Sequence, residues 1–254
     1  MAQSSSSIRL SDFVIILWVL LFLFVPFSGC MSTGDWKEKG DNDFKSGKYS
    51  EAISAYDQAI SLQPNNSEIY YLKGLSLFEM VRYKDAIDAF TAAIRLNAAY
   101  SQAWFWKGRT SYMMGDYDEA VRSFFKAIEI EPGNTEYWYY RGMALSSRGQ
   151  YDMAIQHFDK ALLMIPDDEK VWSARGFAYI MKNNYTESLH SFEQAISMNP
   201  DNAENWINKA SVLRVLGRSD EAKVAMDKAN LLYKEEEKEI SKKVPRTPVQ
   251  FTTQ

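Results

Sequence analysis

Residues 101–134 read SQAWFWKGRTSYMMGDYDEAVRSFFKAIEIEPGN, and this segment decides the fold because its pattern returns every 34 residues along the chain. The period is clearest at the fourth place of each unit, where an aromatic residue recurs: Trp36, Tyr70, Trp104, Trp138, Trp172 and Trp206. A fixed period of this length is typical of a repeat array, in which one supersecondary unit stacks on copies of itself.

Cut at this period, the chain divides into six units without insertions: 33–66, 67–100, 101–134, 135–168, 169–202 and 203–236. The eighth place of each unit is small: Gly40, Gly74, Gly108, Gly142, Gly176 and Ala210. The fifteenth place is glycine in four units and departs in two: Gly47, Val81, Gly115, Gly149, Asn183 and Gly217. The twenty-fourth place is large: Tyr56, Phe90, Phe124, Phe158, Phe192 and Met226.

These columns predict a helical hairpin in each unit. Apolar residues recur at steps of three and four, which is the helical period. Glycine at the fifteenth place suits a left-handed turn after the first helix. Four prolines are expected to stop the second helix, and a polar residue just beyond each can cap the next one: Asn66, Asn134, Asp168 and Asn202. Small residues at the eighth place should let backbones approach, while aromatics at the fourth and twenty-fourth places should fill the space between neighbouring pairs.

The patterns W/Y-x-x-x-G, G-x-Y, A-x-x-x-F-x-x-A and the closing proline resemble the tetratricopeptide repeat family. The resemblance implies an all-α fold, a right-handed α-solenoid of six antiparallel helix pairs over residues 35–234, with the first helices lining a concave groove. The sixth unit is degenerate, as terminal repeats are. Its second helix is expected to continue through Lys234–Lys243, so that residues 235–254 form a capping helix end and a disordered tail.

Residues 1–29 are predicted to be a signal peptide, with an uncharged apolar core at Phe13–Phe27 that is short for a membrane-spanning helix. The sequence Phe27-Ser28-Gly29-Cys30 resembles the lipobox of prokaryotic lipoproteins, which implies lipidation of Cys30, followed by a linker over 30–34. An uncleaved membrane anchor is the alternative. Either way, the repeat domain is expected on the extracytoplasmic side of the cell membrane.

Composition narrows the function. A net charge of −4 and a pI near 5.4 disfavour nucleic acid as a partner. Cys30 is the sole cysteine, so neither an internal disulfide nor a thiolate metal site is expected. The two histidines, His157 and His190, share no column, and no catalytic motif is present. The sequence therefore predicts a protein that is not an enzyme and needs no metal or cofactor.

The resemblance implies that a protein or peptide ligand is held by particular places of the first helices. In this chain those places are rich in aromatic residues and methionine, which adapt to apolar partners: Tyr71, Phe105, Trp106, Arg109, Tyr112, Met113, Tyr139, Tyr140, Met143, Phe177 and Met181. Arg109 is the cation in this set, and it could anchor an acidic ligand group or merely stack on aromatic rings.

A separate basic column precedes the glycine of the eighth place: Lys39, Lys73, Lys107, Arg141, Arg175 and Lys209. It could form a ladder for an acidic ligand, but packing of the stems with solvated charges is the favoured interpretation. Two functions stay open. One is a membrane-anchored interaction scaffold, for example an accessory in the assembly of the envelope or of surface appendages. The other is an accessory subunit of an enzyme complex, such as one acting on cell-surface glycans. The sequence makes no prediction of oligomeric state.

Overall fold

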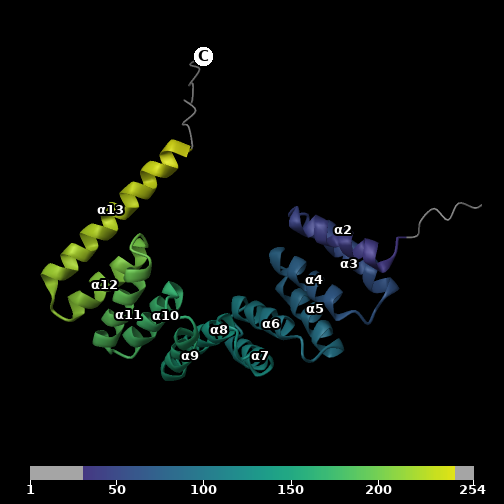
Figure 1. Ribbon diagram of the computed structural model, residues 1–254, viewed down its shortest axis with the longest axis horizontal. Coiled ribbons are helices and arrows are strands. Elements are labelled where there is room, and N and C mark those ends of the chain that lie inside the picture. The colour runs from purple at the N-terminus through teal and green to yellow at the C-terminus, as the bar shows by residue number, and fades with distance from the viewer. Residues whose placement is uncertain (1–30, 244–254) are drawn as a thin grey trace, which may run out of the picture. The chain divides into compact units, whose positions relative to one another are not determined.

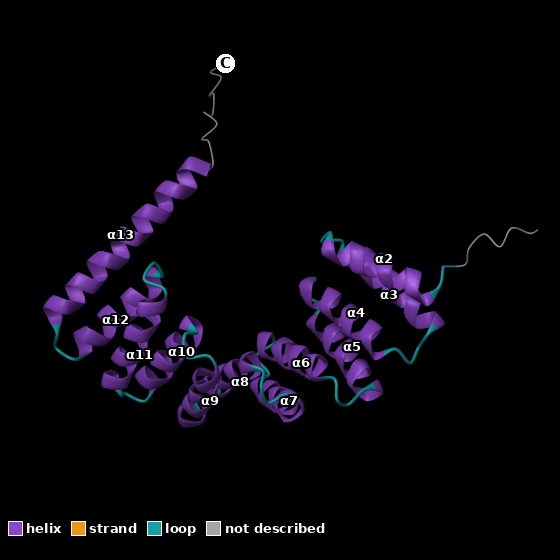
Figure 2. Ribbon diagram, in the orientation of Figure 1, coloured by secondary structure: helices purple, strands orange, loops and turns teal. Residues whose placement is uncertain are grey.

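The computed structural model describes residues 31–243, which form twelve helices and no strand (Figures 1 and 2). The helices are α2 (Thr33–Lys45), α3 (Tyr49–Leu62), α4 (Ser67–Glu79), α5 (Tyr83–Leu96), α6 (Ser101–Met113), α7 (Tyr117–Ile130), α8 (Thr135–Ser147), α9 (Tyr151–Met164), α10 (Glu169–Met181), α11 (Tyr185–Met198), α12 (Ala203–Val215) and α13 (Ser219–Lys243). Each predicted unit is one helix pair. The first helix begins at Thr33, two residues before the predicted start of the repeats at 35.

The helices form two compact units. One contains the pair α2 and α3, and the other begins at Asn65 and contains α4 to α13. In the second unit each helix packs on the next in sequence, so that each pair is stacked on its neighbour. The predicted all-α solenoid of helix pairs is therefore confirmed. The predicted leader 1–29, Cys30 and the tail beyond Lys243 lie outside the described residues.

The interior of the first five hairpins is built on contact between a glycine and an aromatic ring. A Cβ atom added to Gly142 would lie 2.5 Å from the ring of Phe158, and one added to Gly108 would lie 2.8 Å from Phe124. These rings, at the twenty-fourth place, are fully buried. They were expected to fill the space between neighbouring pairs, but each lies first against the glycine of its own pair. Phe124 also reaches the next repeat, where its ring stacks on Tyr140 at 6.0 Å.

The turn at the fifteenth place is left-handed whether or not the residue is glycine. Gly115 has φ +80°, in agreement with the prediction. Val81 and Asn183, which replace glycine, adopt φ values of +60° and +57° at the same place. A valine in this region is strained because its branched Cβ crowds the backbone. The repeat geometry therefore imposes the turn on the residue that occupies it.

The predicted capping residues all work as expected. Asn134 accepts a hydrogen bond from the backbone N–H of Glu136 at 3.1 Å, and Asp168 accepts from Lys170 and Val171. Asn66 and Asn202 cap α4 and α12 in the same way. Each cap satisfies one of the backbone donors that a helix leaves free at its start. Each capping residue therefore sets where the first helix of its repeat begins.

The tryptophans of the fourth place secure the loops that connect the repeats. The indole N–H of Trp172 donates to the carbonyl of Pro166 at 2.7 Å, six residues earlier. The same bond recurs from each of the other tryptophans in this unit: Trp104 to Ala98, Trp138 to Pro132 and Trp206 to Pro200. These side chains are half-buried, so they tie down a loop in addition to filling space between pairs.

The sixth repeat ends the array. As predicted, α13 continues past the repeat boundary, to Lys243. Two columns that are apolar in the five preceding repeats become polar here. Lys223 occupies the place that is apolar in the earlier repeats as Ile53, Ile87, Val121, Ile155 and Leu189. Asn230 likewise occupies the place of Ile60, Ile94, Ile128, Leu162 and Ile196. Both new residues are exposed. At these two places α13 therefore lacks the apolar side chains that the preceding repeats have.

Between residues 31 and 243, no helix combines the length and the apolar character needed to cross a membrane.

Candidate partner-binding surface

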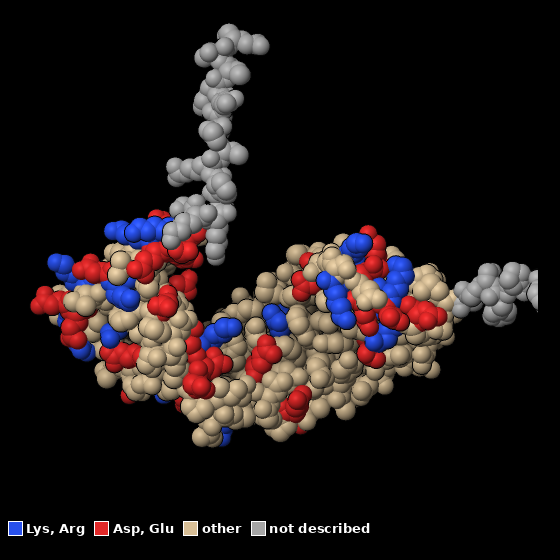
Figure 3. Space-filling model, turned by 45° about the horizontal axis from the view of Figure 1, so that its top comes forward, with Lys and Arg blue, Asp and Glu red and all other residues tan. Residues whose placement is uncertain are grey.

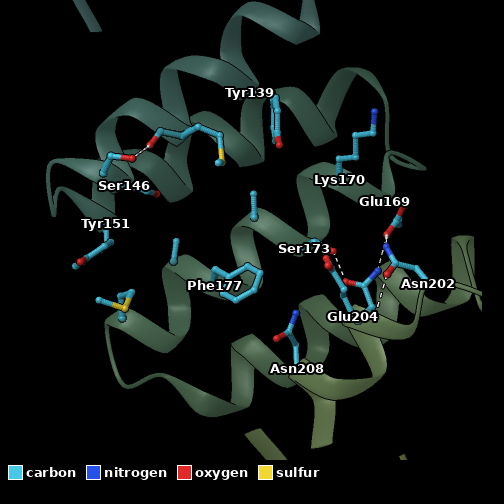
Figure 4. Close-up of a pocket in the computed structure, with 16 residues that line it drawn as sticks. Tyr139, Ser146, Tyr151, Glu169, Lys170, Ser173, Phe177, Asn202, Glu204 and Asn208 are labelled. Atoms are coloured by element: carbon cyan, nitrogen blue, oxygen red, sulfur yellow. Dashed lines mark hydrogen bonds between the residues drawn. The ribbon is translucent and has the colours of Figure 1, made fainter. Parts of the chain in front are cut away.

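A hollow of about 530 Å³ opens between the first helices of the last three repeats, α8, α10 and α12 (Figure 4). Its apolar side comes from Tyr139 and Met143 of α8 and from Phe177 and Met181 of α10. Phe177 is 48 % exposed and Met181 is 57 % exposed. Large apolar side chains that stay this exposed beside a hollow are typical of an interaction surface.

The opposite side of the hollow is a polar network around Glu169 (Figure 4). The Glu169 carboxylate accepts hydrogen bonds from the side-chain amides of Asn202, at 2.6 Å, and of Asn205. Asn199 donates to it at 3.4 Å. The Ser173 hydroxyl in turn donates to the side-chain amide oxygen, Oδ1, of Asn205. A half-buried carboxylate with several amide donors is well satisfied, so the network fixes α10 against α12 as a rigid wall.

Two polar groups of the hollow have no hydrogen-bond partner among the described residues. Tyr139 points its hydroxyl toward the hollow, and Asn208 reaches in from α12 (Figure 4). Burial raises the pKa of Tyr139 to about 12, with smaller contributions from Tyr140 and Asp168. The hydroxyl therefore stays protonated at neutral pH and remains a hydrogen-bond donor. These groups can bind polar atoms of a ligand whose apolar part contacts Phe177.

A second cluster surrounds Arg109 on α6. Its guanidinium carbon lies 4.4 Å from the ring centre of Trp106 and 4.9 Å from that of Tyr140. The rings of Phe78 and Phe105 follow at 5.8 Å each. Arg109 thus lies near aromatic rings, as one of its two predicted roles requires, while its role toward an acidic ligand stays a prediction. Phe78 was absent from the predicted set, although it occupies the same place in its repeat as Tyr112 and could have been found from that register.

Phe105 corrects the predicted surface. Only 4 % of this residue is exposed, so it belongs to the core and offers no face to a partner. Its ring lies 4.8 Å from Tyr137 and 5.7 Å from Phe124. The reason is that the next repeat carries the bulky Tyr137 at its third place, and the aromatic rings close over one another.

The remaining predicted residues lie outside the hollow. Tyr71 is half-buried with its ring 5.0 Å from Tyr100, and burial raises its pKa to about 12. The Tyr112 hydroxyl accepts a hydrogen bond from Ser147 at 3.3 Å. Met113 is 55 % exposed at the end of α6. The sequence-predicted set thus separates into the apolar side of the hollow, the Arg109 cluster and these three peripheral residues.

The polar wall was missed by sequence reasoning, but two of its members carry a signal. Glu169 occupies a place that is a hydroxyl residue in the four preceding repeats: Thr33, Ser67, Ser101 and Thr135. Asn205 occupies a place that is Ile69, Ala103, Tyr137 and Val171 in repeats two to five. Glu169 and Asn205 thus both differ from the residues at the equivalent places of earlier repeats, and they lie in consecutive repeats. This indicates two residues that changed together and contact each other.

The stems of the basic column pack along the array, but several of its charges form ion pairs instead of standing in solvent as expected. Lys209 bonds to Glu193 at 2.9 Å and lies over Trp206 at 5.8 Å. Arg175 bonds to Asp159 at 2.7 Å. Lys107 bonds to Glu119. Burial acts to raise the pKa of Glu119, but Lys107 and Arg122 outweigh it, so the pKa is lowered overall. These pairs use the charges within the chain.

The histidines are packed against tryptophans of the fourth place. His157 lies 5.4 Å from Trp138, and His190 lies 5.9 Å from Trp172. The described residues contain no group of three or more His, Cys, Asp or Glu side chains that could hold a metal ion.

Helix pairs that close on a glycine and stack through tryptophan-tied loops define a helical-repeat scaffold. The chain belongs to the tetratricopeptide repeat family: five family profiles, described as TPR repeat or tetratricopeptide repeat, match it in succession. They match residues 40–81, 71–135, 135–168, 169–202 and 191–224.

Solved structures show the same fold. A crystal structure of MamA is 23 % identical, covers 68 % of this chain and 94 % of its own, and has a TM-score of 0.63. MamA from Desulfovibrio magneticus RS-1 is 18 % identical; the match covers 67 % of this chain and 96 % of that MamA chain, with a TM-score of 0.64. YrrB, described as a TPR protein with an unusual peptide-binding site, is 22 % identical. The match covers 67 % of this chain and 88 % of the YrrB chain, with a TM-score of 0.61. No curated protein matches the chain significantly.

Proposed function

We propose that this protein is a non-catalytic interaction scaffold that holds an apolar segment of a partner protein in the hollow between α8, α10 and α12. The observation that carries the proposal is the exposure of Phe177 and Met181 beside Tyr139 and Met143. Covering such side chains removes apolar surface from water, at about 25 cal/mol per Å². Phe177 therefore gives a partner its main apolar contact.

The rest of the hollow suits this role. The Glu169 network holds its wall in place before binding, which lowers the entropy lost when a partner docks. The free hydroxyl of Tyr139 and the amide of Asn208 can bond to backbone groups of the bound segment. The peptide-binding site named for YrrB, a protein of the same fold, supports a peptide or protein as the ligand class.

The experiment uses random 12-residue peptides displayed on phage, selected on the full chain. Selected peptides are expected to carry Leu, Met or aromatic residues. Phe177→Ala should weaken their binding by tenfold or more, as truncation of a central aromatic anchor does. Phe125→Ala is the matched control, because Phe125 is 39 % exposed on α7, where the Arg141 guanidinium lies 4.7 Å from its ring. Equal binding by both variants would reject the hollow as the site.

We further propose that the N-terminal segment anchors this scaffold to the cell membrane through lipidated Cys30, with the repeats on the extracytoplasmic side. The support is the apolar run of the leader and the single cysteine that ends it. An accessory role in envelope or appendage assembly fits a scaffold at this location. Cys30→Ser should leave the leader uncleaved and abolish labelling by a lipid precursor. Equal label in wild type and variant would exclude the lipid anchor.

A further inference from the structure

Arg109 lies among four aromatic rings, and its hydrogen-bond donors are unused within the described residues. Trp106 and Tyr140 lie over the guanidinium at 4.4 Å and 4.9 Å. Among the described residues no carboxylate or carbonyl bonds to its N–H groups. Some arginines of this unit form ion pairs, such as Arg175 with Asp159 and Arg122 with Glu119, whereas Arg109 forms none among the described residues. Arg109 is also half-buried, so its charge is partly removed from water without a counter-ion to replace it.

We infer that Arg109 docks a carboxylate of the partner segment, supplied by an Asp or Glu side chain. The N–H groups of a guanidinium point outward in its plane, and contact with aromatic rings leaves them unused. A carboxylate matches an edge of that plane with two parallel hydrogen bonds. The aromatic surroundings exclude water and strengthen the pairing. Rings that fix the guanidinium in advance also reduce the entropy lost on binding.

The Arg109 cluster and the hollow are joined by two consecutive tyrosines of α8. Tyr140 stacks on Arg109, and Tyr139 lines the hollow. Their rings lie 5.1 Å apart at an interplanar angle of 74°. One bound segment can therefore place an apolar side chain against Phe177 and an acidic side chain at Arg109. This inference rests on the proposed function and specifies the chemistry of its partner.

The surroundings favour a carboxylate over a more highly charged anion. Among the described residues, Arg109 is the cation that lies over this group of rings. A single guanidinium balances one negative charge, whereas a phosphate dianion needs more cations around it. Figure 3 shows charged side chains crowded over α12 and α13, while most of the visible surface over α6 to α9 is uncharged. Arg109 itself lies among four aromatic rings.

The test starts from the 12-residue peptides selected on the full chain. They are expected to carry an Asp or Glu at a constant spacing from the apolar residue that depends on Phe177. Replacing that residue, Glu→Gln or Asp→Asn, in a synthetic peptide should weaken binding to the wild-type protein about tenfold. The same replacement should have no effect on binding to Arg109→Gln, because the two groups contact each other.

Two variants control for structural damage. Arg109→Lys keeps the charge but loses the planar edge, so its binding should fall between wild type and Arg109→Gln. Arg122→Gln removes an exposed arginine of α7 and should bind as wild type does. If Arg109→Gln proves less helical, the peptide replacement on the wild-type protein still decides the matter.

The outcomes separate this inference from the function on which it rests. Peptides that depend on Phe177 but tolerate both the amide replacement and Arg109→Gln would overturn the carboxylate site and leave the hollow intact. Peptides that do not depend on Phe177 would overturn the proposed function, and this inference with it. Loss at both Phe177 and Arg109, with sensitivity to the peptide carboxylate, supports both.

Discussion

The Asn205 amide donates to the Glu169 carboxylate across 36 residues of sequence, and the Tyr137 hydroxyl donates to Ser101 across the same interval. Both pairs join the first place of one repeat to the third place of the next. The polar wall of the hollow is therefore a variant of a contact used elsewhere in the array. In the hollow it takes a charged form, with Asn199 and Asn202 as further donors to the carboxylate.

Replacing Asn205 should destabilise the array, because its side chain donates to a half-buried carboxylate. Asn205→Ala leaves the half-buried Glu169 with fewer donors, and we expect a loss of about 1–3 kcal/mol in the free energy of unfolding. Glu169→Ala should cost a similar amount. The double variant should cost clearly less than the sum of the two, as measured by urea titration. Strict additivity would show that the two side chains act independently.

Val81→Gly should stabilise the protein. The valine adopts a left-handed φ of +60° while exposed, so its strain lacks compensating burial. Relief of that strain exceeds the extra chain entropy of glycine, and we expect a gain of up to about 1 kcal/mol. Asn183→Gly is the matched control at the same turn three repeats further along the chain, and it should change little because asparagine tolerates this region. Urea titrations in which both variants respond alike would refute the assignment of strain to Val81.

Gly142→Ala should destabilise the fourth repeat. Its new Cβ would lie 2.5 Å from the buried ring of Phe158, and overpacking of this kind costs about 1–3 kcal/mol. Phe158→Leu in the same chain should recover part of the loss by making room. Gly133→Ala is the control, because nothing lies within 4 Å of the added atom. Thermal unfolding followed by circular dichroism distinguishes the three, and an unchanged midpoint for Gly142→Ala would contradict the close contact.

Stability should fall in mildly acidic solution because of His157. Burial lowers its pKa below the usual 6.5, and the charge of Arg141 adds to this effect. Nδ1 bonds to the carbonyl of Met153 at 2.8 Å, whereas Nε2 is buried without a partner in the described structure. As the pH falls through 6.5, the unfolded chain takes up a proton before the folded chain does, so the free energy of unfolding decreases.

The same measurement on His157→Phe isolates this contribution. The phenyl ring keeps the packing against Trp138 but cannot titrate. The difference in stability between wild type and variant should be constant above about pH 7 and should change below 6.5. A difference that stays constant from pH 7.5 to pH 5 would exclude His157 as the cause.

The sequence predicts the hairpins well because each depends on local chemistry that recurs. The caps at Asn66 and Asn134, the turn at Gly115 and the extension of α13 all follow from side chains near the backbone they stabilise. The surface is harder, since whether a groove residue is covered depends on the next repeat. Phe105, at the fifth place of its repeat, is covered because Tyr137 is large, whereas Phe177, at the ninth place of a later repeat, stays open. Whether such a side chain is exposed therefore depends on the particular residue that the next repeat places against it.

The polar residues that end the array, Lys223 and Asn230, have a consequence for how copies of the chain meet. A repeat protein whose last helix kept the isoleucines of its predecessors would present the same surface that its internal repeats bury, and copies could add there without limit. With a lysine and an asparagine in those places, α13 does not repeat that surface, although other side chains of the helix such as Val224 and Leu231 are exposed. A designed extension of the array would therefore have to restore apolar side chains at both places.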